Sequence, residues 1–125
     1  MSVIFLHSNE VNWEENFNQA QKVFGKCKLV NGLSCRNIKE AYQLILSNAD
    51  RNFIMIEGDN FVFDSACNIN LDTPSKFKTL NKFGIRYHHG GIKVLNKEET
   101  ILSLNSSHIL ENFEIIGIAE LGSNN

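Results

Sequence analysis

The sequence has few of the features that would place it outside the ordinary globular proteins. Its three cysteines, Cys27, Cys35 and Cys67, form no CxxC pair, and an odd number is a poor disulfide framework. No apolar run approaches the roughly 20 residues that a membrane span needs. Proline is nearly absent, with Pro74 alone. We therefore expect free thiols, buried as small apolar side chains, in a reducing compartment and without a membrane partner.

Neither sign of charge dominates the chain. Twelve Lys and Arg stand against 14 Asp and Glu, which gives a formal net charge of -2. Nucleic-acid-binding domains are usually basic, so this balance does not indicate a nucleic-acid partner, although Lys76, Lys78, Lys82 and Arg86 form a local basic cluster. The start, MSVIFLHSNE, lacks the charged and long apolar segments of a signal peptide. The sequence predicts a cytoplasmic protein, bacterial or phage-encoded.

The pattern of apolar residues predicts an α/β fold. A chain of 125 residues is long enough for one domain with its own core, which we assign to 1–125. Short apolar runs predict strands, and helical spacing of apolar residues predicts helices between them. In chain order we expect strand 2–6, helix 13–24 stopped at Gly25, strand 28–30, helix 37–47 and strand 52–56. This alternation predicts a mostly parallel sheet with flanking helices.

The second half of the chain has a weaker pattern. We expect a short extended piece at 61–63, a glycine-interrupted bend leading into a strand within 86–95, a short helix at 97–103, and a last strand at 114–119. Residues 67–82 are polar and carry no clear assignment. The tail, 122–125, is expected to fray.

The stretch FIMIEGDN places two carboxylates, Glu57 and Asp59, directly after an apolar strand. In an open parallel sheet, ligands bind at the carboxyl ends of the strands. The glycine between the acids lets their oxygens converge on a cation, and Mn²⁺ or Mg²⁺ prefers one or two carboxylates plus phosphate oxygens and waters. The alternative is a solvated turn in which Asp59 or Asn60 makes a local cap.

Two further segments carry candidate binding residues. In Tyr87-His-His-Gly-Gly-Ile-Lys93, paired glycines allow close backbone approach to a ligand, Lys93 suits a phosphate, and His88 or His89 could complete a metal shell. The polar loop after the first strand, His7 to Asn12, lies at the same edge as Glu57 and suits a base or ribose. For the Tyr87 to Lys93 segment, the alternative is a glycine bend with surface histidines. For the His7 to Asn12 loop, the alternative is a connection in which Asn12 caps a helix. The chain has no GxGxxG, P-loop, GxSxG or HExxH motif.

Together these segments resemble nucleotide-sugar-dependent glycosyltransferases of the GT-A fold, and more closely a group of small bacterial and phage glycosyltransferase-like proteins. The resemblance is carried by Asn9-Glu-Val-Asn12 with Glu15-Asn-Phe17, by Asn31-Gly32, by the strand ending in Glu57-Gly-Asp59, and by Tyr87 to Lys93. It spans about residues 3–95. Glu57 stands where the first acid is usually Asp, and His88 where the group has Gly. The segment between Asp64 and Phe83 looks shortened, as in a truncated member.

The resemblance implies a nucleotide-diphosphate sugar as donor and a divalent cation, Mn²⁺ or Mg²⁺, that bridges its diphosphate. The implied metal residues are Glu57, Asp59, His88 and His89. The implied donor-binding residues are His7, Asn9, Glu10, Asn12, Asn60, Gly90, Gly91 and Lys93. No general base is singled out, although Asp64, Glu98 and Glu99 are available.

Three functions are compatible with these patterns. The first is a metal-dependent glycosyltransferase with an unknown acceptor. The second is a non-catalytic module that binds a nucleotide or a partner protein on a shortened glycosyltransferase fold. The third is a structural or interaction domain, such as a homodimer built on an exposed sheet edge. Turnover of a nucleotide-sugar separates the first from the second, and absence of nucleotide binding identifies the third.

Overall fold

The structure is a computed structural model that describes residues 2–68, 75–77, 79–80, 86–87, 91–104 and 114–116. The strands are β1 (Ser2–His7), β2 (Lys28–Asn31), β3 (Asn52–Glu57), β4 (Ser75–Phe77), β5 (Thr79–Leu80), β6 (Arg86–Tyr87), β7 (Ile92–Asn96) and β8 (Glu114–Ile116). The helices are α1 (Trp13–Phe24), α2 (Ile38–Leu46), α3 (Lys97–Leu104) and the short 3₁₀ helix η1 (Asp64–Asn68).

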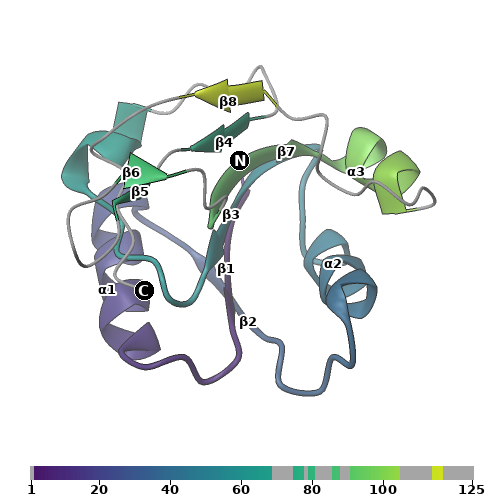
Figure 1. Ribbon diagram of the computed structural model, residues 1–125, viewed down its shortest axis with the longest axis horizontal. Coiled ribbons are helices and arrows are strands. Elements are labelled where there is room, and N and C mark those ends of the chain that lie inside the picture. Colours follow the sequence, from purple (N-terminus) through teal and green to yellow (C-terminus); the bar gives the residue numbers. More distant parts are fainter. Residues whose placement is uncertain are drawn as a thin grey trace.

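One sheet runs in the order β2-β1-β3-β7-β4-β8, while β5 and β6 pair separately (Figure 1). β1 lies parallel to both β2 and β3, so that Phe5 stands opposite Leu29 on one side and Ile56 on the other. β7 is antiparallel to β3 and β4, and β4 is parallel to β8. The predicted α/β fold with a mostly parallel sheet and flanking helices is confirmed, with β7 as an antiparallel insertion.

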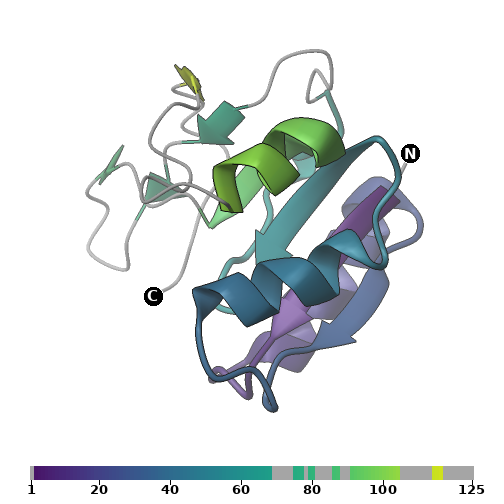
Figure 2. The same ribbon diagram turned by 90° about the vertical axis from the view of Figure 1, so that its right-hand side faces the viewer.

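The two faces of the sheet build two apolar clusters, because successive strand residues point to opposite faces. Val3, Phe5, Ile54 and Ile56 pack with Ala20 of α1. On the other face, Ile4, Phe53 and Met55 pack with residues of α2 and with Leu104 of α3. Figure 2 shows α2 and α3 side by side on one face of the sheet, with α1 behind it. The sheet is therefore covered on both sides, which explains its nearly continuous apolar strands.

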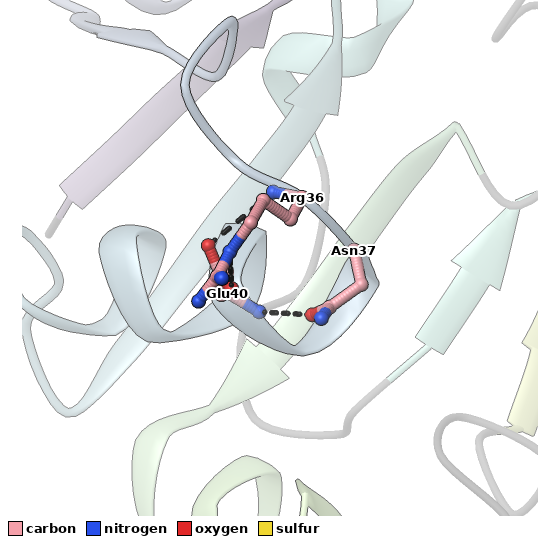
Figure 3. Close-up of polar contacts among 3 residues, drawn as sticks. All are labelled: Arg36, Asn37 and Glu40. Atoms are coloured by element: carbon pink, nitrogen blue, oxygen red, sulfur yellow. Dashed lines mark hydrogen bonds and ion pairs between the residues drawn. The ribbon is translucent and has the colours of Figure 1, made fainter.

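Helix α2 starts with a side-chain cap (Figure 3). The Oδ1 atom of Asn37 accepts the backbone N–H of Glu40 at 2.9 Å. The Glu40 carboxylate in turn accepts the N–H of Arg36 at 3.3 Å and its Nε–H at 2.9 Å. This reciprocal arrangement satisfies donors that the first helical turn leaves without partners. It fixes the start of α2 one residue after the beginning of the predicted helix.

Helix α1 has the predicted bounds, Trp13–Phe24, but lacks a side-chain cap at its start. Gly25 follows it with φ 87°, and its N–H donates to the carbonyl of Gln21 at 2.8 Å. A positive φ at this position favours glycine. Asn12 precedes the helix at φ 64° and makes no side-chain cap, so the expected capping role of its side chain is wrong. The Asn12 carbonyl instead accepts the N–H of Asn16 at 3.0 Å.

The three cysteines occupy different environments. Cys27 is buried in the cluster under α1, and burial raises the pKa of its thiol to about 11. Cys67 is exposed and Cys35 is intermediate, so burial of all three is a wrong expectation. All three are free thiols, as the odd count predicts.

Other differences lie after β3. Residues 61–63 belong to no strand and lead instead into η1, which the sequence did not predict. Of the last strand expected at 114–119, the structure describes Glu114–Ile116 as β8. The remaining residues of that prediction and the tail 122–125 lie outside the described residues. No helix in the described part of the chain is long and apolar enough to cross a membrane.

Candidate functional site

The carboxyl ends of β1 and β3 lie side by side and form the rim of a pocket. Leu6 of β1 stands opposite Glu57, the last residue of β3. A pocket of about 240 Å³ opens at this edge. It is lined by Leu6, Ser8, Glu10, Glu57 and Asp59. The structure therefore brings the predicted acidic pair together with Glu10 of the first loop.

The turn after β3 is held by backbone and amide hydrogen bonds. The Asn60 N–H donates to the Glu57 carbonyl at 3.1 Å, which closes the turn. The Glu57 N–H donates to the Gly91 carbonyl at 2.8 Å, and the Gly58 carbonyl accepts Nδ2 of Asn16 at 3.0 Å. Asn16 comes from α1 and is almost fully buried. The turn is thus fixed both to α1 and to the segment before β7.

Glu10 lies directly against this turn. Its carboxylate accepts the backbone N–H of Ser8 through both oxygens. A Cβ at Gly58 would stand only 3.0 Å from Cδ of Glu10, so glycine at position 58 makes room for the carboxylate. The Glu10 carboxylate consequently shares the pocket with Glu57 and Asp59 instead of extending into solvent.

Lys93 supplies positive charge from beneath the rim. Its Nζ atom lies 3.9 Å from Oε1 of Glu57, and its side chain is 6% exposed against 41% for Glu57. In this position its charge acts on Glu57, and contact between Lys93 and a phosphate stays a prediction. Tyr42 of α2 is buried on the same side; burial, and then the charge of Glu57, raise the pKa of its hydroxyl.

The first loop forms a second pocket that shares Glu10. His7 is buried and stacks on Trp13, with the ring centroids 3.9 Å apart and an angle of 13° between the ring planes. Asn9 and Asn12 are exposed, and their backbones adopt the left-handed conformation at φ 60° and 64°, which Asn tolerates better than most residues. This pocket of about 490 Å³ is lined by Asn9, Glu10, Asn12, Trp13, Glu14 and Glu15. Of the predicted donor-binding residues, Asn9, Glu10 and Asn12 therefore lie together, with His7 behind them.

The donor chemistry of the rim suits a hard divalent cation. Glu57 and Asp59 offer carboxylate oxygens at one pocket, and Mg²⁺ or Mn²⁺ completes such a shell with phosphate oxygens and waters. Within the described residues, no three His, Cys, Asp or Glu side chains are grouped so that they could hold a metal ion. His88, His89 and Gly90 lie outside the described residues, so their predicted roles stay predictions.

Two residues of this edge were not predicted from the sequence. Asn16 lies in the Glu15-Asn-Phe17 segment, but a single amide among helical residues gives no sign that it will reach a strand end 42 residues away. Tyr42 looks like an ordinary apolar residue of α2. The signal that identifies Asn16 is its position: it shares a helix face with Ala20, which is buried. A buried amide on such a face needs a partner.

Comparison with known proteins supports the fold. No family model and no curated protein sequence matches the chain. Among solved structures, it is similar to a glycosyltransferase involved in the glycosylation of the major capsid of PBCV-1, at 11% identity and a TM-score of 0.57. The alignment covers 95% of this chain and 83% of that chain. At this identity the likeness concerns the fold alone: the chain has a glycosyltransferase-like fold.

Proposed function

We propose that the protein is a metal-dependent glycosyltransferase that binds a nucleotide-diphosphate sugar at the carboxyl edge of β1 and β3. The observation that supports this function best is the pocket where Glu10, Glu57 and Asp59 meet. It lies at the edge where open α/β sheets bind ligands, in a fold shared with a glycosyltransferase. The acceptor is a molecule with a nucleophilic group that takes the sugar.

Glu57 and Asp59 hold the cation in this proposal. A bound Mn²⁺ or Mg²⁺ supplies Lewis-acid stabilisation of the negative charge on the departing diphosphate. The chain contributes a rigid pair of carboxylates, because the turn that carries them is tied to Asn16 and Gly91. Lys93 limits the repulsion within this acidic pocket through its 3.9 Å contact with Glu57. His88 and His89 are proposed as further metal ligands.

The larger pocket takes the nucleoside. Asn9, Asn12 and Glu10 offer amide and carboxylate groups for base edges and ribose hydroxyls, and the Trp13 ring, backed by His7, is an apolar wall for a base. The two pockets share Glu10, so a nucleotide can occupy both, with its phosphates next to Glu57 and Asp59. Gly90 and Lys93 remain proposed donor-binding residues.

A binding screen tests this function. The purified protein is titrated calorimetrically with UDP, GDP, ADP, TDP and CMP and with their sugars, each with and without Mn²⁺ or Mg²⁺. We expect one nucleotide to bind only with the cation. Steady release of more than one sugar per protein identifies a transferase or hydrolase, whereas binding without turnover identifies a non-catalytic module. Absence of binding to every nucleotide would contradict both.

Asp59→Ala provides the matching mutational test. The substitution removes one proposed cation ligand at the pocket rim, and we expect cation-dependent nucleotide binding to fall below detection. Asp59 is partly buried and accepts a hydrogen bond from the Asn60 amide, so the free energy of unfolding should fall by about 0.5–1.5 kcal/mol while the protein stays folded. Asp50→Ala, at the opposite edge of the sheet, is the control that should bind normally. Unchanged binding by the Asp59 variant would contradict the metal assignment.

A further inference from the structure

Asn60 occupies an unusual place beside the proposed cation pair. It is fully buried, with no exposed surface, although it directly follows Asp59 at the pocket rim. Its Nδ2 group donates to the Glu57 carbonyl at 3.1 Å and to Oδ1 of Asp59 at 2.8 Å. One amide group therefore ties the backbone of the first acidic residue to the side chain of the second.

Chemistry fixes the direction of this amide. If the group were turned over, its oxygen would face two acceptor oxygens, those of the Glu57 carbonyl and the Asp59 carboxylate. In the present orientation, Oδ1 of Asn60 is buried and has no hydrogen-bond partner among the described residues. A buried acceptor without a partner is unfavourable. An amide retained at that cost indicates that its two donated hydrogen bonds matter.

Gly91 makes room for Asn60. A Cβ at position 91 would lie 2.6 Å from Cγ of Asn60 and still closer to its amide atoms, which is too close for any real contact. The carboxamide is buried and cannot swing aside like an exposed chain end. Gly91 is itself buried, and its carbonyl accepts the N–H of Glu57. The glycine thus supports the acidic turn through its backbone and through the space it leaves.

We propose that Asn60 is a positioning residue, which holds the Asp59 carboxylate in the orientation that binds the cation and does not itself contact the donor. The inference rests on the proposed function and reassigns Asn60 from the donor-binding set. Its burial leaves no surface for a ligand, whereas its hydrogen bonds span both acidic residues. Gly91 serves the same purpose indirectly, by leaving the space that the carboxamide fills.

The test measures Mn²⁺ binding by the full chain, by electron paramagnetic resonance, in the presence of each nucleotide of the binding screen, for the wild type and three variants. Asn60→Ala removes both donated hydrogen bonds, and Gly91→Ala displaces the carboxamide without changing either acid. Asn96→Ala is the matched control, because it also removes two hydrogen bonds of a side-chain amide at the opposite edge of the sheet. Nδ2 of Asn96 donates to Oδ1 of Asn52 at 3.0 Å, and Oδ1 of Asn96 accepts the Glu99 N–H at 3.0 Å. Near-ultraviolet circular dichroism shows that each variant is folded at the temperature used.

We expect Asn60→Ala and Gly91→Ala each to weaken Mn²⁺ binding by about 10- to 100-fold, the usual effect of losing a group that orients a metal ligand. Asn96→Ala should lower the melting temperature and leave Mn²⁺ binding unchanged. Wild-type affinity in the folded Asn60 or Gly91 variant would overturn the positioning role and leave the proposed function standing. Absence of Mn²⁺ binding by the wild type would instead overturn the proposed function, and the positioning role with it.

Discussion

The two edges of the parallel strands use charged residues differently. At the amino edge, lysine ammonium groups donate to backbone carbonyls, and their charges act on one exposed carboxylate. The Lys28 ammonium donates to the Asn48 carbonyl at 2.7 Å, and the Lys97 ammonium to the Ala49 carbonyl at 3.3 Å, just after α2. A hydrogen bond from Ser2, and then the charges of Lys28 and Lys97, lower the pKa of Asp50. Cations near a helix C-terminus are stabilising, so this edge supports the fold.

At the carboxyl edge, like charges gather around one pocket. Glu10, Glu57 and Asp59 line it together, and Lys93 lies beneath Glu57. The same α/β sheet therefore has ammonium groups bound to backbone carbonyls at one edge and three carboxylates around one pocket at the other. Under the proposed function, the cation binds at the edge that carries the carboxylates.

The largest expected effect on stability comes from a substitution in the apolar core, which supports both edges of the sheet. Phe5 is fully buried at the centre of β1 and packs edge-to-face on Phe17, at a centroid distance of 5.4 Å. Phe5→Ala should lower the free energy of unfolding by about 3–5 kcal/mol, because it removes the ring and leaves a cavity. Urea denaturation followed by tryptophan fluorescence measures this change. A loss below 1 kcal/mol would show that Phe5 is not at the centre of the core.

A substitution at the carboxyl edge should have a smaller effect, on ligand binding alone. Gly58→Ala introduces a methyl group against the Glu10 carboxylate, which is the far end of a flexible side chain and can move. We expect unfolding free energy to change by no more than about 0.5 kcal/mol, while Mn²⁺-dependent nucleotide binding weakens by about tenfold. In a Glu10→Ala background, Gly58→Ala should have no further effect. An equal loss in both backgrounds would show that Gly58 acts independently of Glu10.

The smallest effect concerns the amino edge and depends on pH. The pKa of Asp50 is lowered in the folded protein, so its stabilising contribution is present above its unfolded pKa of about 3.9 and is lost as pH falls through the folded value. Asp50→Asn should therefore be slightly less stable than the wild type at pH 7 and equal to it at pH 2. Urea midpoints at the two pH values provide the comparison. A difference that persists at pH 2 would exclude the charge as its origin.

Local patterns in the sequence predicted the first half of the fold. The spacing of Phe17 and Ala20 identified α1, because residues three or four positions apart share one face of a helix. Gly25 marked the end of α1, because glycine readily adopts the positive φ that follows a helix. The direction of β7 could not be predicted in this way. Its pairing joins Phe53 to Leu95, 42 positions apart, and nothing in either segment specifies an antiparallel partner. η1 was missed because residues 64–68 carry no helical pattern of apolar residues.

The candidate site was predicted only in part, because local patterns are visible in a sequence and contacts between distant residues are not. Acidic residues directly after an apolar strand are visible in a sequence, so Glu57 and Asp59 were identified, and the structure places them at one pocket with Glu10. The burial of Lys93 and Asn60 was not visible. Both residue types are usually exposed, and their burial follows from contacts with Glu57 and Gly91 that only the folded chain creates.

The contact between Asn60 and Gly91 also limits how the sequence can change over time. An alanine at position 91 is incompatible with the carboxamide at position 60, but it would be harmless beside a smaller residue there. Substitutions at the two positions should thus be mutually conditional, each tolerated or rejected according to the other. In related sequences that keep this turn, positions 60 and 91 are expected to covary, although 30 residues separate them along the chain and neither needs to touch a ligand.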